Sequence, residues 1–300
     1  MNKIPSYLKK GDTIGIVSLA GRCNKKHLQT AINTFEEWGL KTIIGKHLFD
    51  YENQFAASDK NRLADLNSMI EDNNIKAIIS LRGGYGSVRL LDDINYSHLA
   101  KKPKWIIGFS DITAIHSAIA IKSNIASLHA TMPVNFADCH PNTLDTLQNA
   151  LFGNDLKYEI KSHKLNRNGN AKAEIVGGNL SVLYSLRGTE YDIDTNNKIL
   201  FIEDLNEYLY HIDRMMMNLK LGGKLTNLNG LIVGAFSDMK DNDTKFGKTA
   251  YEIIADTVKE FNYPIIFDFK AGHIKENNAL IFGIKTEINV NEDFSEINFK

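Results

Sequence analysis

Cysteine is scarce in this 300-residue chain, which has only Cys23 and Cys139, far apart in the sequence. This spacing excludes a disulfide framework and a zinc site of paired cysteines as the basis of the fold, and it favours a reducing compartment. A surplus of basic side chains is also absent, because 35 Lys and Arg residues stand against 36 Asp and Glu residues. Nucleic-acid-binding proteins are typically basic, so we expect no nucleic-acid partner.

Long apolar segments are missing as well. No apolar run approaches the roughly 18 residues that a membrane-spanning helix needs. The first ten residues, MNKIPSYLKK, contain no apolar stretch of signal-peptide length. We therefore expect a soluble, cytoplasmic protein with no membrane partner. The composition, with 43% hydrophobic and 24% charged residues, is that of a globular protein, and the length favours about two domains.

The first half of the chain alternates short apolar segments with amphipathic ones. We expect strands at 13–19, 42–44, 77–81 and 105–109, and helices at 24–38, 59–72, 87–91 and 112–122. Strands this apolar, separated by helices, indicate a parallel sheet that is covered on both faces. The sequence therefore predicts a doubly wound α/β domain over residues 1–140.

The pattern weakens between about 135 and 170, and we expect residues 141–165 to form a linker. Beyond it the sequence predicts a second, smaller, β-rich domain over residues 166–300. Its expected strands are 172–176, 199–202, 231–236, 265–267 and 280–284, and its expected helices are 179–186 and 207–219. The alternating tail 287–299 predicts an antiparallel hairpin.

Two turns in the first domain follow strands, and ligands of parallel sheets bind at the carboxyl ends of the strands. The first turn is Arg82-Gly83-Gly84-Tyr85-Gly86, in which three glycines allow backbone N–H groups to converge on an anion. The third glycine of the dinucleotide-binding pattern and the lysine of a P-loop are absent. A tight turn would need the same glycines, so an anion cradle and a plain turn are both open.

The second turn is Gly108-Phe109-Ser110-Asp111-Ile112-Thr113. A serine between a strand and a helix can be held on a sharp turn as a nucleophile, with the N–H of Asp111 directed at an oxyanion. Ile112 stands where the hydrolase pattern G-x-S-x-G has its last glycine, and Ser and Asp are also common helix caps. A nucleophile and a helix cap are alternatives for Ser110 at this point.

A nucleophilic serine needs a general base, and the chain has nine histidines. Most of them lie in expected helices or in polar segments typical of a surface. His129, near the end of an expected strand, and His273, in the polar loop after Gly272, are the candidates. Glu203 and Asp204 follow the strand 199–202, where a carboxylate would orient the histidine or complement the dipole of the next helix.

Together with Gly177-Gly178-Asn179-Leu180 and Ile212-Asp213-Arg214-Met215, these motifs resemble the LD-carboxypeptidase family, the muramoyltetrapeptide carboxypeptidases, in order and over nearly the whole chain. The resemblance implies a serine peptidase with a class I amidotransferase-like first domain and a smaller β-rich second domain. It also implies roles for single residues: Ser110 as nucleophile, His273 as base, Glu203 as orienting acid, and the backbone N–H groups of Asp111 and Gly84, with Gly83 as an alternative, as oxyanion hole.

The same resemblance implies a small peptide substrate, the cytoplasmic murein tetrapeptide, which loses its terminal D-alanine in peptidoglycan recycling. It implies no metal, no organic cofactor and a homodimer. Arg82 and Arg214 are candidates for binding the terminal carboxylate, although Arg82 is also suited to bracing its own turn, and Tyr85 is a further candidate for substrate binding. Two other functions are open: an immunity peptidase that cleaves a peptidyl- or aminoacyl-nucleotide antibiotic, and a non-catalytic anion-binding protein.

Overall fold

The computed structural model describes residues 2–299, which divide into two compact units. The first unit consists of the chain up to Asp155 together with Lys275–Gly283. The second consists of Leu156–Ile274 together with the chain from Ile284 onward. Each unit is therefore built from two separate segments, which differs from the expected domains 1–140 and 166–300 with a linker at 141–165.

The stretch expected to be a linker contains regular structure instead. Helix α5 (Pro141–Phe152) and strand β6 (Lys157–Lys161) occupy most of it. Pro141 stands at the first position of α5, where the missing N–H has no helical partner to lose. Gly153 ends the helix in the left-handed region, with φ 72°. The proline and the glycine that look like loop residues in the sequence thus mark the two ends of a helix.

The first unit contains a six-stranded sheet in the order β11-β5-β4-β3-β1-β2. Five of its strands are parallel, and β11, which comes from the segment near residue 280, is antiparallel to β5. The strands are β1 (Thr13–Val17), β2 (Lys41–Ile44), β3 (Ile75–Ser80), β4 (Trp105–Gly108), β5 (Ser127–His129) and β11 (Leu280–Phe282). The prediction of a doubly wound α/β domain is confirmed.

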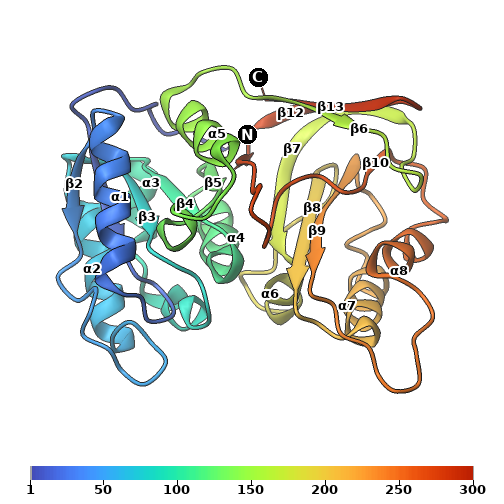
Figure 1. Ribbon diagram of the computed structural model, residues 1–300, viewed down its shortest axis with the longest axis horizontal. Helices are drawn as coiled ribbons and strands as arrows, with labels where there is room; N and C mark the ends of the chain where they lie inside the picture. The colour runs from blue at the N-terminus through green and yellow to red at the C-terminus, as the bar shows by residue number, and fades with distance from the viewer. Residues whose placement is uncertain (1, 300) are drawn as a thin grey trace. The chain divides into compact units, whose positions relative to one another are not determined.

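Helices connect the parallel strands of this unit and pack against the sheet (Figure 1). They are α1 (Lys25–Glu37), α2 (Asp59–Glu71), α3 (Tyr96–Lys101) and α4 (Thr113–Lys122), with a short 3-10 helix at Ser87–Asp93. The strand order reverses between β1 and β3, and at such a switch point loops diverge and leave room for a ligand. The loops that follow these two strands are joined there, because the Gly21 N–H donates to the Gly83 carbonyl oxygen at 3.0 Å.

The second unit contains a seven-stranded sheet in the order β10-β9-β8-β7-β12-β13-β6. Strand β7 (Gly169–Asn179) joins its two parts, because residues 169–174 pair antiparallel with β12 and residues 175–179 pair parallel with β8. Figure 1 shows the long course of this strand. The other strands are β8 (Ile199–Leu205), β9 (Gly230–Ser237), β10 (Ile265–Ile266), β12 (Lys285–Val290) and β13 (Phe294–Phe299). The antiparallel pairing of β12 with β13 confirms the expected C-terminal hairpin.

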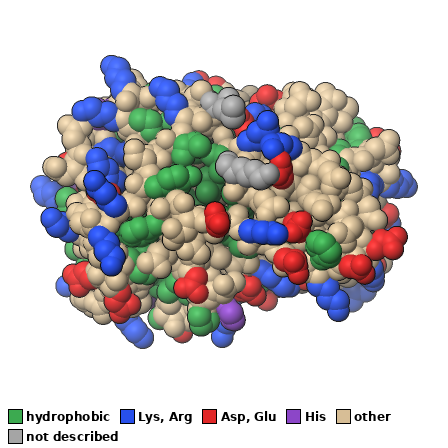
Figure 2. Space-filling model, turned by 90° about the horizontal axis from the view of Figure 1, so that it is seen from above, with side chains coloured by type: hydrophobic (Ala, Val, Ile, Leu, Met, Phe, Trp, Pro, Cys, Tyr) green, Lys and Arg blue, Asp and Glu red, His purple; other side chains and the backbone are tan. Residues whose placement is uncertain are grey.

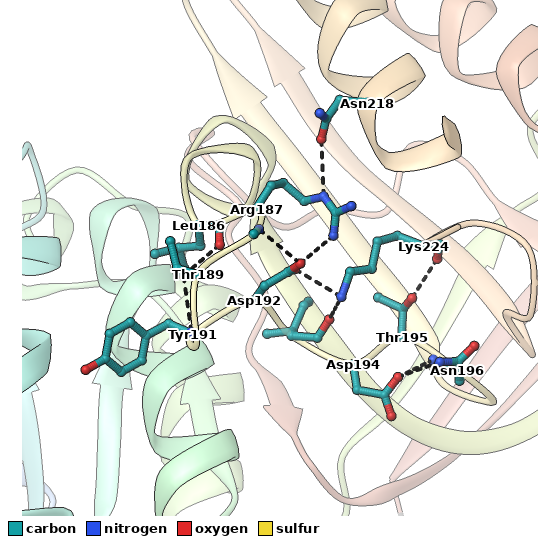
Figure 3. A network of polar contacts seen from close by, with 12 residues as sticks. Leu186, Arg187, Thr189, Tyr191, Asp192, Asp194, Thr195, Asn196, Asn218 and Lys224 are labelled. Atoms are coloured by element: carbon teal, nitrogen blue, oxygen red, sulfur yellow. Dashed lines mark hydrogen bonds and ion pairs between the residues drawn. The ribbon is translucent and has the colours of Figure 1, made fainter. Parts of the chain in front are cut away.

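Three helices, α6 (Leu180–Ser185), α7 (Leu209–Leu221) and α8 (Ala250–Thr257), contribute to the apolar core of the second unit. A polar network fixes the loop that leads into β8 (Figure 3). Asp192 accepts from Arg187 at 2.5 Å and from Lys224 at 3.0 Å, and the Nε of Arg187 donates to Asn218 at 3.2 Å. This network anchors the amino end of the strand that carries Glu203 and Asp204.

Surface charge agrees with the balanced composition. Figure 2 shows Lys and Arg side chains interspersed with Asp and Glu side chains over the face that it draws. Within residues 2–299, no helix is both long enough and apolar enough to span a lipid bilayer.

Candidate active site

Ser110 occupies a strained turn at the carboxyl end of β4. Its φ is 62°, in the left-handed region that a residue with a side chain seldom adopts. Such a conformation costs about 1–3 kcal/mol and persists where the surrounding structure enforces it, often at functional sites. Residues Ser110–Ile112 form a 3-10 turn that leads into α4. The segment thus has the strand–turn–helix geometry of a nucleophile elbow, although it lacks the usual last glycine.

The glycine-rich turn after β3 packs directly against this serine. A Cβ atom added to Gly83 would lie 3.1 Å from both Cβ and Oγ of Ser110, so a larger residue would press on the hydroxyl. Because the Gly83 carbonyl accepts from Gly21, the N–H of the same trans peptide, which belongs to Gly84, points the opposite way. Gly84 is exposed and has a φ of 117°. This orientation suits an N–H group that donates to a ligand.

Asp111 joins the two turns. Its carboxylate accepts from the Ser87 N–H at 2.8 Å, and its carbonyl oxygen accepts from the Ser87 hydroxyl at 2.6 Å. The carboxyl is buried, and burial raises its pKa although the hydrogen bonds from Ser87 and Gly86 oppose that rise. The side chain of Asp111 is therefore committed to internal structure, which leaves its backbone N–H as the group proposed from the sequence to act on a substrate.

Two buried histidines of the first unit have structural surroundings. His116 donates from Nε2 to the Gly108 carbonyl oxygen at 2.9 Å, and burial lowers its pKa to about 4, so it is neutral at neutral pH. His129, the alternative base, is fully buried, and its ring centroid lies 5.4 Å from that of Phe282 and 6.0 Å from that of Phe109. An imidazole enclosed by aromatic rings is poorly placed to exchange protons with a substrate.

Glu203 and His273 form a buried acid–base pair within the second unit. Nδ1 of His273 lies 2.8 Å from Oε2 of Glu203, whose side chain is fully buried. Burial lowers the pKa of His273, but the charge of Glu203, its hydrogen bond and the charge of Asp204 outweigh that effect and leave the pKa above its ordinary value. With Nδ1–H donating to the carboxylate, Nε2 is the ring nitrogen that lacks a proton in the neutral imidazole and can accept one.

The local backbone fixes this pair. Gly272 has a φ of 118°, and a Cβ atom added there would lie 2.7 Å from Oε2 of Glu203, so glycine is required beside the carboxylate. A register shift between β8 and β9 occurs at Glu203, and such bulges commonly redirect side chains next to active sites. At this bulge the Ala235 N–H donates to the Ala271 carbonyl at 2.9 Å, and the Ser237 hydroxyl donates to the His273 carbonyl at 3.1 Å.

Asp204, the neighbour of Glu203, serves a different purpose. Its carboxylate accepts from the Asn179 side chain at 3.0 Å and from the Ser181 N–H at 2.9 Å, at the start of α6. Burial, followed by the charge of Glu203, raises its pKa to about 7. The two adjacent acids point to opposite faces of the strand, as the period of two in a strand dictates. Of the two alternatives in the sequence, only Glu203 bonds to His273.

The candidate substrate-binding residues differ in their surroundings. Arg82 donates from Nη1 to the Arg22 carbonyl at 2.7 Å, which agrees with a bracing role for that side chain. Tyr85 is 53% exposed, and its ring lies 6.2 Å from that of Phe55. Arg214 lies on α7 over the ring of Tyr210, with its Cζ atom 5.1 Å from the ring centroid.

The predicted site residues thus fall into two groups, one in each unit. Ser110, Asp111, Gly83 and Gly84 gather at the carboxyl edge of the first sheet, and Glu203 and His273 at that of the parallel part of the second. Sequence reasoning missed the carboxylate bond of Asp111 and the bulge in β9, because neither has a sequence signature. Among residues 2–299, no group of three or more His, Cys, Asp and Glu side chains is arranged to hold a metal ion.

Two family models match the chain. The LD-carboxypeptidase N-terminal domain matches residues 14–130, and the LD-carboxypeptidase C-terminal domain matches residues 172–288. A probable murein peptide carboxypeptidase of Bacillus subtilis is 35% identical over 297 residues, which cover 97% of this chain and 93% of that protein. The microcin C7 self-immunity protein of Escherichia coli is 23% identical over 316 residues, with 94% and 91% covered.

Solved structures have the same fold. A muramoyltetrapeptide carboxypeptidase from Oxalobacter formigenes matches with a TM-score of 0.88 at 26% identity, over 96% of this chain and 98% of that one. The microcin C7 self-immunity protein without ligand matches with a TM-score of 0.87 at 22% identity, over 100% and 99% of the two chains.

Proposed function

The chain belongs to the LD-carboxypeptidase family, and from this premise we propose that it is a serine carboxypeptidase that releases the terminal D-alanine from murein tetrapeptide. The scissile bond is an amide between an L-configured centre and the D-amino acid. The observation that carries the proposal is the buried pair in which Glu203 accepts from His273 at 2.8 Å. A binding protein would have no use for an oriented, carboxylate-paired imidazole beside a glycine loop.

In the proposed acylation step, Ser110 Oγ attacks the carbonyl carbon of the scissile amide and His273 accepts the hydroxyl proton. Glu203 holds the imidazole in the required tautomer and stabilises its protonated form. The N–H groups of Asp111 and Gly84 stabilise the tetrahedral oxyanion. His273 then gives its proton to the nitrogen as the C–N bond breaks, so that D-alanine leaves and an ester to Ser110 is left behind.

Deacylation repeats the same proton transfers with water. His273 accepts a proton from a water molecule whose oxygen attacks the ester carbonyl, and the second tetrahedral intermediate uses the same two N–H groups. The C–O bond to Ser110 breaks as His273 returns the proton to Oγ, which releases the tripeptide and regenerates the enzyme. In comparable sites each oxyanion donor contributes about 2.7–4 kcal/mol to transition-state stabilisation.

The test is mass spectrometry of a purified murein tetrapeptide incubated with the protein. The wild type should release D-alanine and tripeptide, and Ser110→Ala should release neither while keeping a wild-type melting temperature. Normal turnover by the folded Ser110→Ala variant would remove this serine from the mechanism and end the proposal.

The finer parts of the proposal concern substrate contacts and setting. We assign Tyr85 and the part of the Arg82 guanidinium that does not bond Arg22, which flank Gly83 and Gly84, to the binding of the substrate. We also propose a cytoplasmic homodimer that needs no cofactor. Arg82→Ala and Tyr85→Ala should raise KM more than they lower kcat, because they remove binding that is equal in the ground and transition states. Light scattering at micromolar concentration measures the oligomeric state directly.

A second candidate function rests on the similarity to the microcin C7 self-immunity protein. Structures of that protein include a complex with aspartyl sulfamoyl adenosine. An immunity peptidase would cleave the bond between the aspartyl carbonyl carbon and the sulfamoyl nitrogen, with the same Ser110, Glu203 and His273. Parallel assays with murein tetrapeptide and aspartyl sulfamoyl adenosine separate the two functions. The chain is 35% identical to a murein peptide carboxypeptidase and 23% identical to the self-immunity protein, which favours the murein peptidase function.

A further inference from the structure

Arg62 is a buried cation at the carboxyl edge of the first sheet. It lies in the first turn of α2, is 1% exposed, and none of the sequence motifs includes it. Its guanidinium donates to the carbonyl oxygens of Leu19, Ala57 (3.2 Å) and Gly86 (3.0 Å), and to the Asp59 carboxylate. One side chain thus ties the loop after β1, the loop before α2 and the glycine-rich turn after β3.

The contact with Gly86 reaches the oxyanion hole assigned above. Gly86 has a φ of 132°, and an added Cβ atom would lie 2.9 Å from Nη1 of Arg62, so the turn and the guanidinium fit only with glycine at this position. Next to it, Ser87 is fully buried and donates twice to Asp111, from its N–H and from its hydroxyl. Arg62 and Asp111 also attract each other electrostatically.

The two assigned oxyanion donors lie in turns that follow different strands, and these contacts bridge the two turns. The Gly84 N–H belongs to the turn after β3, and the Asp111 N–H belongs to the turn after β4. Their relative position depends on the bonds from Arg62 to Gly86 and from Ser87 to Asp111. A displacement of about 1 Å between donors and substrate can cost roughly 100-fold in rate.

We infer that Arg62 and Ser87 are positioning residues of the oxyanion hole, which hold the N–H groups of Gly84 and Asp111 at a fixed separation. The inference rests on the proposed serine carboxypeptidase function. An arginine is needed at this place because its planar fork presents five N–H donors in fixed directions, whereas the ammonium of lysine is a single point with three donors. Arg62→Lys therefore keeps the charge but loses the geometry.

The test compares Arg62→Lys and Ser87→Ala with a matched control, Arg167→Lys. Arg167 lies in the second unit, is half-buried, and also donates to backbone carbonyl oxygens, those of Val258 (3.2 Å) and Phe261, which belong to no part of the candidate site. Each positioning variant should lower kcat for murein tetrapeptide about 10- to 100-fold, with KM changed less than about threefold. Arg167→Lys should keep both constants.

A tripeptide with a boronic acid in place of the scissile carbonyl supplies a readout that a merely structural role would not move. Ser110 Oγ adds to its boron and forms a tetrahedral anion, which needs the oxyanion donors. Affinity for this boronate should fall in parallel with kcat, while affinity for the product tripeptide stays constant. If either Arg62→Lys or Ser87→Ala folds and keeps wild-type kcat and boronate affinity, the inference is overturned.

The same experiment separates the inference from the function on which it rests. If wild-type protein releases no D-alanine, or if Ser110→Ala retains turnover, the proposed function fails. If Ser110→Ala is inactive and a folded Arg62→Lys or Ser87→Ala is as active as the wild type, the function stands and the positioning role fails.

Discussion

Among single residues, the charge of Glu203 controls the acidity of His273. Burial alone would lower the pKa of the imidazole, and the adjacent carboxylate raises it above the ordinary value near 6.5. His273 acts as a base only when it is neutral. The rate constant kcat/KM should therefore fall as the pH drops through a value above 6.5.

Glu203→Gln tests this control. The variant removes the charge that raises the pKa of His273 and keeps the burial that lowers it, so the acid limb of the kcat/KM profile should move to lower pH. The same change should lower kcat by about 10⁴, as expected when the orienting acid of a triad is neutralised. Glu207→Gln, which removes the partner of His211 instead (2.6 Å), is the matched control and should leave the limb in place. An acid limb that stays or moves upward in Glu203→Gln would contradict the assignment.

His116 should make the first unit sensitive to acid. Its pKa is about 4 in the folded chain and near 6.5 in the unfolded one, so its neutral form contributes stability that is fully present above pH 6.5 and lost as the pH falls toward 4. The loss amounts to about 3 kcal/mol. His116→Gln keeps a donor for the Gly108 carbonyl but cannot titrate, and should flatten this loss.

Urea unfolding of wild type, His116→Gln and the exposed-site control His140→Gln at pH 7 and pH 4.5 measures the effect. The wild type and His140→Gln should lose stability in parallel. Equal acid sensitivity in all three proteins would show that His116 does not cause it.

The sequence predicts those site residues whose role follows from their residue type and their position relative to a strand or loop. Ser110 and Glu203 come directly after apolar runs in the sequence, and His273 lies in a polar loop after Gly272, so each was a candidate before the family resemblance implied its role. Arg62 and the carboxylate of Asp111 could not be found in this way, because they bond backbone groups that come together only when the loops have folded. From the sequence alone, an arginine on an amphipathic helix is expected on the polar, exposed face, so the burial of Arg62 is not predictable.

Among the elements, the loop that carries His273 depends on Gly272. Gly272→Ala would place a Cβ atom 2.7 Å from the Glu203 carboxylate and would strain a φ of 118°. We expect a stability loss of at least about 1–3 kcal/mol, together with a fall in kcat of at least tenfold because the pair is pushed apart.

Gly247→Ala is the matched control for this element. Gly247 also has a positive φ, 83°, but nothing lies within 4 Å of an added Cβ atom. It should show the backbone strain without the loss of kcat. Chemical denaturation and tetrapeptide kinetics on both variants distinguish strain from contact, and equal kinetics in the two would refute the steric account.

Helix α5 and strand β6 show where element prediction fails. Leu144, Leu147 and Leu151 have helical spacing and Tyr158 and Ile160 alternate as in a strand, but Pro141 and Gly153 also mark loops and outweighed these short patterns. The helix exists because its apolar side chains meet the rest of the first unit, with Leu147 and Leu151 fully buried. Strands of continuous apolar residues such as β1 and β8 were predictable, since burial on both faces leaves that pattern in the sequence.

For the whole molecule, the chain passes between the two units three times. The sequence of residues 275–300 does not show that the chain returns to the first unit, because strand β11 looks like any other apolar strand of the second half. Its partner is decided by tertiary contact: Ile281 pairs with Leu128 of β5, and the Phe282 ring contacts that of His129 with centroids 5.4 Å apart. The family resemblance and the apolar pattern predict two domains, but the bounds of the two units depend on strand pairings such as that of β11 with β5.

The discontinuous first unit leads to a prediction about fragments. A fragment that ends at Asp155 lacks β11 and leaves β5 as an unpaired edge, which favours aggregation. The His140 N–H, at the start of α5, donates to the Lys275 carbonyl oxygen at 2.9 Å, and α5 has 12 residues, about 18 Å in length. A flexible Gly/Ser linker of roughly ten residues spans that distance and can join residue 155 to residue 275.

The linked protein 1–155/275–283 should be monomeric and unfold cooperatively, while 1–155 alone should aggregate. Ile281→Asp in the linked protein removes the buried strand contact without changing its length, and should behave like the bare fragment. Light scattering and thermal unfolding of the three proteins decide the matter: a well-folded, monomeric 1–155 would show that β11 is dispensable to the unit.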